Sequence, residues 1–259
     1  MTSAVTWKGG ASAASALWSY FALQISQAGG TNRSPRSYDF NAMEKHPIGP
    51  NAILVQPLNR SFFARSPQRV ARALLGKILV REDTVRLAAR IVEVEAYLGT
   101  NDPASHAYAG NTLRNSVLFG PPGYAYIYFI YGNHYCLNVS CEREGKAGGV
   151  LFRALEPVCG IKEMARARGI SPLTPRDLPR LTSGPGRLAQ AFSITRSRDN
   201  GRDLTSPTSS LWLGEDGFRA KNIQITPRIG ITKAAERPLR FILGGNPFLS
   251  GKKRSVYAT

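Results

Sequence analysis

Hydrophobic and polar positions alternate in the segment ARIVEVEAYL (residues 89–98), which predicts a β-strand. Because side chains alternate between the faces of a strand, Val92, Val94 and Ala96 form an apolar face. The opposite face carries Glu93, Glu95 and Tyr97. This acidic face is either a solvated surface with ordinary ion pairs or a reaction centre. The polar loop that follows carries His106.

A second alternating pattern, YAYIYFIYGNHYCLNVSCE (residues 124–142), predicts a β-hairpin that turns at Gly132-Asn133. Tyr124, Tyr126 and Tyr128 share one face of its first strand, and we expect Tyr124 and Tyr126 to serve packing alone. Tyr131 lies on the other face, directly before the turn. A large ring at a hairpin tip is hard to bury within its own domain.

The remaining pattern predicts one mixed domain of helices and strands, since no repeat or linker follows residue 50. A helix is expected over 66–76, with Ser66 as N-cap, Pro67 in the first turn and Gly76 as the stop. Further helices are expected over 160–170 and 184–194. The other expected strands are 77–82, 149–157 (closed by Pro157), 227–232 and 238–243.

The first 45 residues differ from the rest, because no charged residue occurs between Gly9 and Asn32. The apolar part is too short and polar for a membrane span and only faintly resembles a signal peptide. Translation from Met43 is an alternative start. We expect residues 1–45 to be a poorly ordered extension and residues 46–259 to form the functional domain.

The chain is strongly basic, with 34 Lys and Arg against 17 Asp and Glu and a net charge of +17. Such a surface attracts polyanions, and nucleic acid is the first candidate, although a ribosome-associated or membrane-surface protein would share this charge. Cys136, Cys141 and Cys159 lack the spacing of a disulfide framework or zinc site, so we expect reduced thiols in a cytoplasmic protein.

Charge and aromatic residues together suggest base flipping. Next to a duplex, Tyr131 could insert between bases, and such wedges unstack a step at a cost of about a few kcal/mol. An extruded base then needs aromatic faces on which to stack. Tyr97, His106 and Tyr128 are the rings that lie near the carboxylates in sequence or in the expected strand pairing.

Five motifs occur in an order and spacing that resemble the alkyladenine (3-methylpurine) DNA glycosylase family. They are RIVEVEAYLGTNDPASHAY, YIYFIYGNHYCLNVS, VLFRALEP, LTSGPGRLAQAFSI and PRIGI…PLRFILGGNP, and together they cover about Leu54 to Ser250. The resemblance implies an α+β fold: a single mixed domain around a curved antiparallel sheet with a protruding β-hairpin. It also implies no metal and no organic cofactor.

The resemblance further implies a role for individual residues. Glu95 would be the general base that activates water, with Arg153 and the main-chain carbonyl of Ile229 holding that water. Tyr97 would stack on one face of the flipped base, and His106 and Tyr128 on the other. Tyr131 would intercalate in the DNA. Asn138 would lie beside the purine edge and exclude guanine.

The resemblance therefore implies a monofunctional DNA glycosylase. Such an enzyme would remove alkylated or deaminated purines from double-stranded DNA and start base-excision repair. The expected protein is a monomer that contacts no membrane and is cytoplasmic, or nucleoid-associated in a bacterium. No lysine lies in the catalytic strand, which argues for water over a Schiff base, although Lys77 and Lys146 stay open as amines.

Two other functions compete with this interpretation. A non-catalytic nucleic-acid-binding protein would use the tyrosines as stacking platforms and would tolerate loss of the Glu95 charge. Carbohydrate hydrolysis by Glu93 and Glu95 fits less well, because the basic surface does not suit a neutral sugar polymer. We expect Glu93 to be structural and to pair with an arginine.

Overall fold

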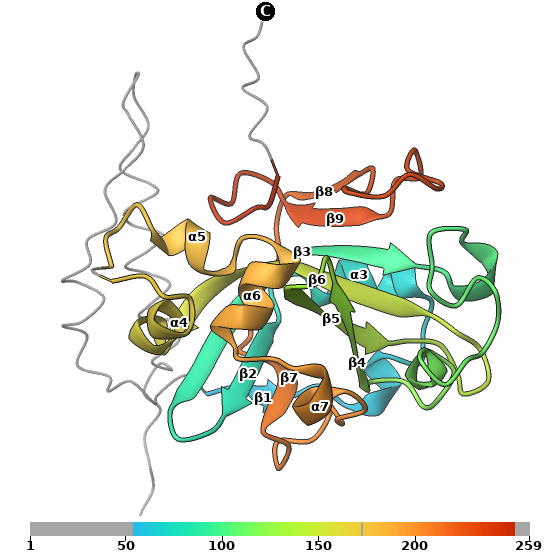
Figure 1. Cartoon of the computed structure of the whole chain (residues 1–259), viewed down its shortest axis with the longest axis horizontal. Helices are drawn as coiled ribbons and strands as arrows, with labels where there is room; N and C mark the ends of the chain where they lie inside the picture. Colours follow the sequence, from blue (N-terminus) through green and yellow to red (C-terminus); the bar gives the residue numbers. More distant parts are fainter. Residues whose placement is uncertain (1–53, 172, 252–259) are drawn as a thin grey trace, which may run out of the picture. The chain divides into compact units, whose positions relative to one another are not determined.

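The structure is a computed structural model that describes residues 54–171 and 173–251; the expected extension, residues 1–45, and the alternative start at Met43 lie outside the described residues. Within these ranges, nine strands form one antiparallel sheet (Figure 1). They are β1 (Gln56–Pro57), β2 (Ile78–Glu82), β3 (Arg86–Tyr97), β4 (Ala125–Ile130), β5 (His134–Ser140), β6 (Gly149–Cys159), β7 (Leu211–Glu215), β8 (Ile223–Thr226) and β9 (Arg240–Leu243).

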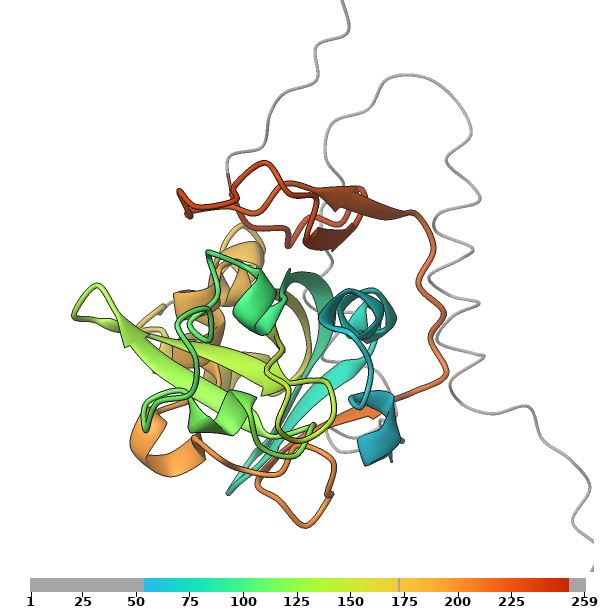
Figure 2. The same cartoon turned by 90° about the vertical axis from the view of Figure 1, so that its right-hand side faces the viewer.

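Short helices cover both faces of the sheet. They are α3 (Pro67–Leu74), α4 (Ile161–Ala167), α5 (Leu178–Thr182), α6 (Pro185–Ala191) and α7 (Arg196–Asp199), with 3-10 turns at Arg60–Phe62, Gly99–Asn101 and Ser116–Leu118. Helix α6 packs on β5 and β6 and against α4 and α5, whereas α3 packs against β3 and β6 from the opposite face (Figure 2). Ser66 precedes α3 as expected, but its side chain makes no capping hydrogen bond.

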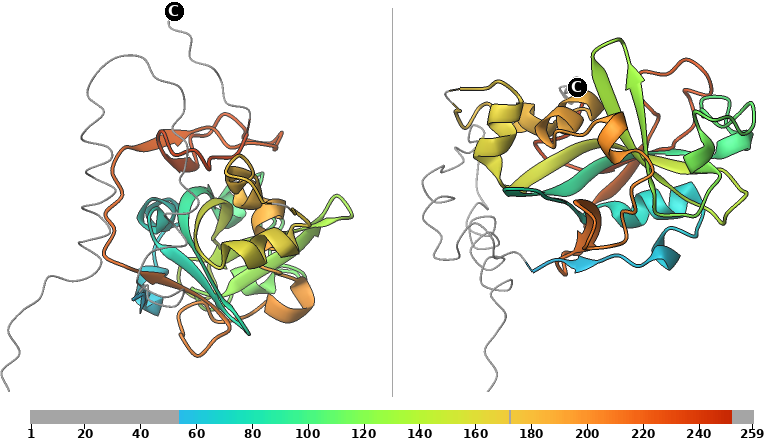
Figure 3. Two further views of the ribbon diagram at one scale, coloured as in Figure 1. Left: turned by 90° about the vertical axis from the view of Figure 1, so that its left-hand side faces the viewer. Right: turned by 60° about the horizontal axis from the view of Figure 1, so that its bottom comes forward.

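Strand β3 organises the sheet, because it pairs with β6 along one edge and with two different strands along the other. Its first half, Arg86 to Arg90, pairs with β2, and Glu93 to Glu95 pair with β9. The strand order is β1-β7-β2-β3-β6-β5-β4, with β8 and β9 branching from β3. The sheet is therefore curved rather than flat (Figure 3), and the prediction of a single α+β domain around a curved antiparallel sheet is confirmed.

Two register shifts lie side by side between β3 and β6. Ile91 and Glu93 oppose Leu155 and Ala154, which leaves Val92 as an extra residue on β3. Glu93 and Val94 then oppose Ala154 and Phe152, which leaves Arg153 as an extra residue on β6. An extra residue of this kind re-aims side chains locally. The irregularity falls at the point where Glu93 and Arg153 meet.

Three details of the sequence interpretation are wrong. Residues 227–232 are irregular, and the strand lies just before them as β8. Strand β6 continues past Pro157, which has no N–H to donate and pairs with Ala89 where the register shifts. The hairpin turn comprises residues 131–133, because Ile130 pairs with His134 and the positive φ angles belong to Tyr131 (55°) and Gly132 (71°).

The core lies where β3 and β6 pass between the helical layers. Phe63, Leu74, Phe152, Leu155 and Phe192 are fully buried there. Both faces of β3 are buried, and Glu93 and Glu95 have no exposed surface. The idea that these carboxylates lie on a solvated face is therefore excluded.

Truncation of Phe152 tests this core. We expect Phe152→Ala to lower the free energy of unfolding by about 3–5 kcal/mol, because the side chain is fully buried and leaves a cavity. Urea denaturation followed by circular dichroism measures this loss. Phe129→Ala is the control, since Phe129 is 46% exposed. Equal losses in the two variants would contradict the assigned core.

Candidate active site

Glu95 is the buried centre of the predicted site. Its Oε1 accepts a hydrogen bond from the backbone N–H of Ile229 at 2.8 Å, and its Oε2 accepts one from the Tyr97 hydroxyl at 3.0 Å. Arg153 Nη1 lies 3.3 Å from Oε1. Burial raises the pKa of Glu95 above its ordinary value, and the charge of Arg153 and the two hydrogen bonds only partly oppose this shift.

Arg153 joins the parts of the site that come from different segments. Its Nη1 donates to the Ile229 carbonyl at 3.3 Å while also facing Glu95. Burial alone would lower the pKa of Arg153, but the charges of Glu95 and Glu93 raise it, so the guanidinium stays protonated. The structure thus brings together the three groups that the sequence assigns to the water: Glu95, Arg153 and the Ile229 carbonyl.

Glu93 binds the Arg153 guanidinium at Nε, whereas Glu95 lies next to Nη1. Glu93 Oε1 accepts hydrogen bonds from Arg153 Nε at 2.9 Å, Arg240 Nε at 2.7 Å and the Ser250 hydroxyl at 2.7 Å. Its Oε2 accepts the backbone N–H of Ser250 at 2.5 Å. The expected pairing of Glu93 with an arginine is present. Its position behind Arg153 suits a structural role rather than a second catalytic carboxylate.

The aromatic residues form the wall of the site. The His106 and Tyr128 rings pack edge to face with centroids 4.4 Å apart. The Tyr126 hydroxyl lies 2.9 Å from His106 Nδ1, so Tyr126 does more than pack, contrary to the expectation. Partial burial, followed by the charge of Arg114, lowers the pKa of His106, and the ring is therefore neutral at pH 7.

A row of paired residues places Asn138 relative to Glu95. Glu95 on β3 pairs with Leu151 on β6, which pairs with Asn138 on β5, which pairs with Tyr126 on β4. Paired residues point to the same face of a sheet. Asn138 therefore lies two strands, about 10 Å, from Glu95 on the face that carries the tyrosines. Its side-chain amide is buried and donates to the Tyr126 carbonyl at 3.1 Å.

Tyr131 lies in the turn between β4 and β5. This turn lies at one margin of the ribbon in Figure 2. The residue is 79% exposed, and its φ of 55° is uncommon for a residue with a side chain. The backbone at Tyr131 therefore adopts an unfavourable conformation in which the ring is exposed to solvent. This is the property expected of a group that contacts a partner rather than the core.

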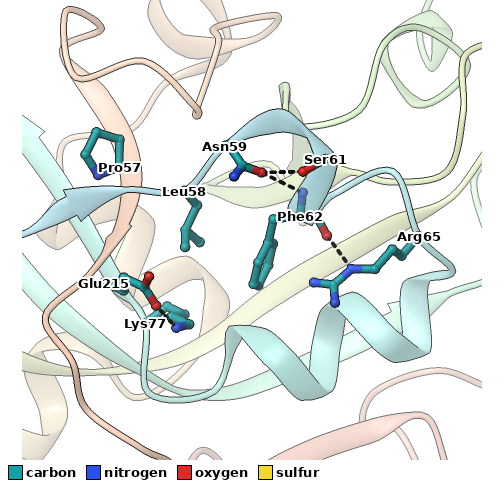
Figure 4. Close-up of a pocket in the computed structure, with 8 residues that line it drawn as sticks. All are labelled: Pro57, Leu58, Asn59, Ser61, Phe62, Arg65, Lys77 and Glu215. Atoms are coloured by element: carbon teal, nitrogen blue, oxygen red, sulfur yellow. Dashed lines mark hydrogen bonds and ion pairs between the residues drawn. The ribbon is translucent and has the colours of Figure 1, made fainter.

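The two lysines that sequence left open lie away from Glu95. Lys77 pairs with Glu215 in a pocket of about 350 Å³ (Figure 4), lined by Pro57, Leu58, Asn59, Ser61, Phe62, Arg65, Lys77 and Glu215. Its carbonyl accepts from Ile91, which is four residues and about 13 Å from Glu95 along the strand. Lys146 pairs with Glu142 at 3.1 Å.

Comparison with known proteins identifies the family of this chain. A profile of the family described as "Methylpurine-DNA glycosylase (MPG)" matches residues 61–247. The chain belongs to the methylpurine-DNA glycosylase family. It is therefore a DNA glycosylase, a hydrolase that acts on N-glycosyl bonds in DNA repair.

Several individual proteins are similar to this chain, and they share one name. A protein of Koribacter versatilis named "Putative 3-methyladenine DNA glycosylase" is 58% identical over 207 residues, covering 79% of this chain and 99% of that protein. Proteins of the same name from Rhodopseudomonas palustris (48% identical, 75% of this chain and 90% of that protein) and Alkaliphilus oremlandii (45%, 75% and 99%) are also similar.

Sequence reasoning missed several residues of the candidate site. Arg240 and Arg228 are guanidinium groups in apolar runs, as Arg153 is in VLFRALEP. Asp102, the partner of Arg228, gave no sign beyond its place in a polar loop. Cys136 pairs with Tyr128 across the hairpin and is 3% exposed.

No described helix is long and apolar enough to cross a membrane. Across residues 54–171 and 173–251, no group of three or more His, Cys, Asp or Glu side chains is placed to hold a metal ion. Cys136 and Cys141 are buried, and Cys159 is half-buried.

The Glu93 network can be tested by stability. Glu93→Gln should lower the free energy of unfolding by about 3–5 kcal/mol, because it leaves Arg153 and Arg240 buried with a neutral partner. Glu82→Gln is the matched control, since Glu82 is 39% exposed and pairs with Arg86 at 3.2 Å. Its loss should stay below about 1 kcal/mol. Urea titrations that give both variants the same small loss would contradict the network.

Proposed function

We propose that this protein releases alkylated and deaminated purines from double-stranded DNA by hydrolysis, with Glu95 activating the attacking water. The observation that carries the proposal is the buried Glu95, which faces Arg153 and the Ile229 carbonyl and lies beside the Tyr97 ring. A carboxylate in this position both accepts a proton from water and faces the positive charge that develops on the sugar.

In the proposed reaction the target nucleotide swings out of the duplex and its base enters between Tyr97 and the His106–Tyr128 pair. Glu95 takes a proton as the water oxygen bonds to C1′, the N-glycosidic bond breaks, and its electron pair leaves with the base. The products are an abasic site and the free purine. General base catalysis contributes typically about 10²–10⁴-fold, and positioning must supply the remainder.

The electrostatics of the wall suit a cationic base. Alkylation at purine N3 or N7 gives the base a positive charge, which is attracted to the faces of tyrosine rings. Because His106 has a lowered pKa, a neutral ring rather than an imidazolium faces that charge. Asn138 lies on the same face as Tyr126, where it would crowd the exocyclic amino group of guanine.

A cluster of arginines supports contact with the duplex backbone. Arg168, Arg180 and Arg187 lie on or directly after α4, α5 and α6, and burial together with the charges of Arg187 and Arg180 lowers the pKa of Arg168. Gly186 on α6 lies against His134, which begins the strand after the hairpin turn. Phosphate oxygens would relieve this repulsion next to Tyr131. We expect the protein to act as a monomer in the compartment that holds the DNA.

Base release by Glu95→Gln is the experiment that tests the function. The wild type should release base from a duplex with a single hypoxanthine and from methylated DNA, leaving abasic sites without spontaneous strand breaks. Glu95→Gln should bind the same duplexes and lose at least about 10²-fold in single-turnover rate. If both proteins bind DNA equally and neither releases base, the non-catalytic binder is the better account.

The pH dependence follows from the raised pKa of Glu95. The base must be ionised, so the rate should fall as pH drops through a midpoint above the ordinary glutamate value of about 4.3. Single-turnover release of hypoxanthine between pH 4.5 and 8 measures this limb, as about a tenfold fall per unit below the midpoint. The limb should persist in His106→Gln; its disappearance there would assign it to His106.

The role of Tyr131 predicts a difference between duplex and single strand. Tyr131→Ala should slow release from a duplex by about tenfold or more, because a wedge offsets part of an unstacking cost of about a few kcal/mol. Release from a single-stranded oligonucleotide with the same lesion should not change. Tyr131→Phe keeps the ring and should behave as wild type. Equal slowing on both substrates would contradict the wedge.

A further inference from the structure

A buried ion pair joins Asp102, in the loop that follows β3, to Arg228, in the segment that follows β8. Arg228 Nη1 and Nη2 donate to Asp102 Oδ2 and Oδ1 at 2.5 and 2.9 Å, and both side chains are 0% exposed. Arg228 also donates to the carbonyls of Ala96 at 3.1 Å and Ala234 at 3.3 Å. Two parallel hydrogen bonds to one carboxylate fix the orientation of a guanidinium as well as its position.

Each group held by this pair is next to a residue of the proposed site. Ala96 lies between Glu95 and Tyr97, and Arg228 is followed directly by Ile229. Asp102 lies four residues before His106 and accepts the backbone N–H groups of Leu98 (3.2 Å) and Ala104 (3.2 Å). Three segments that carry the water-holding carbonyl, the base-stacking tyrosine and the histidine therefore meet at one ion pair.

The guanidinium also occupies one side of the Tyr97 ring. Its carbon lies over the ring, 4.6 Å from the centroid. The Tyr97 hydroxyl is held by Glu95 at 3.0 Å, so the ring is fixed both at its edge and on one face. A base can then stack only on the face that Arg228 leaves open.

We propose that the Arg228–Asp102 pair is a positioning device that sets the distance between the hydrolytic and base-stacking halves of the site. This inference rests on the proposed function. The pair touches neither the base nor the water. It acts by holding Tyr97 and the Ile229 backbone against Glu95, and by fixing the loop that carries His106 at the opposite wall.

Loss of the pair has a consequence that a purely structural pair lacks. The Ile229 N–H and the Tyr97 hydroxyl both donate to the Glu95 carboxylate and lower its pKa. If their positions loosen, the ionised form of Glu95 loses part of this stabilisation. The acid limb of the pH–rate profile should then move to higher pH.

A second ion pair, between Arg90 of β3 and Asp216, provides a control. Arg90 Nη1 and Nη2 donate to Asp216 Oδ1 and Oδ2 at 3.1 and 2.7 Å, and Arg90 lies over the Phe218 ring at 4.2 Å. Arg90 also donates to the Gly76 carbonyl at 2.9 Å. This pair repeats the Arg228–Asp102 arrangement at the opposite end of β3 and contacts no residue of the proposed site.

The experiment compares Arg228→Gln/Asp102→Asn with Arg90→Gln/Asp216→Asn. Each double variant replaces a charged pair by amides that can still hydrogen-bond, which avoids an uncompensated buried charge. Single-turnover release of hypoxanthine is measured at saturating protein across the pH range, at a temperature where circular dichroism shows every variant folded. Duplex affinity is measured separately by fluorescence anisotropy.

The proposal predicts that Arg228→Gln/Asp102→Asn slows release by about 10- to 100-fold, since small misplacements of reacting groups cost this much. Its acid limb should rise by about one pH unit, the scale expected for weakening a hydrogen bond to a carboxylate. Duplex affinity should stay near that of wild type. The Arg90→Gln/Asp216→Asn control should lose stability but keep the release rate and the acid limb of the wild type.

A wild-type rate and acid limb in the folded Arg228→Gln/Asp102→Asn variant would overturn the proposal, as would equal losses in the control. If this double variant does not fold, Arg228→Lys serves instead, because it keeps the charge beside Asp102 but loses the planar face on Tyr97. It should show the same two changes, and wild-type behaviour would again overturn the proposal. Absence of base release by the wild type itself would instead refute the proposed function.

Discussion

The site depends on one carboxylate, that of Glu95, which is fully buried within the sheet. An isolated charge in such a place would neutralise, and burial does raise the pKa of Glu95. The charge of Arg153 and donors from Ile229 and Tyr97 oppose that shift. Arg153 in turn shares Glu93 with Arg240, so two carboxylates balance two guanidinium groups. The proposed general base is thus shielded from bulk water, while one cation and two hydrogen-bond donors favour its ionised form.

The geometry of the sheet explains why these charges can meet. Strand β3 has β6 on one edge and β2 and then β9 on the other, so Arg153 and Arg240 approach it from opposite sides. The paired register shifts place Arg153 as an extra residue opposite Glu93 and Val94. The same face continues through Asn138 and Tyr126 to the hairpin that carries Tyr131. One curved surface therefore holds the proposed hydrolytic groups and stacking rings, and it leads to the turn that carries Tyr131.

Local sequence patterns predicted the features that depend on neighbouring residues in the chain. Alternation in β3 and in the hairpin led to the right strands, whereas the groups that meet at Glu95 followed from the family resemblance. The turn contains the predicted Gly132-Asn133 but is one residue longer, because Tyr131 itself adopts a positive φ, which sequence disfavours. The Arg228–Asp102 pair joins residues 126 positions apart, and no periodicity encodes such a contact. Burial of Glu93 likewise required tertiary structure, since alternation is the same for a solvated face.

The most direct measurement is a crystal structure of Glu95→Gln bound to a duplex with a single hypoxanthine. The account predicts the base between Tyr97 and the His106–Tyr128 pair, Tyr131 in the gap, and a water between residue 95, Arg153 and the Ile229 carbonyl, facing C1′. A base that remains stacked in the duplex, or one that is bound with its C1′ turned away from residue 95, would contradict Glu95 as the group that activates water.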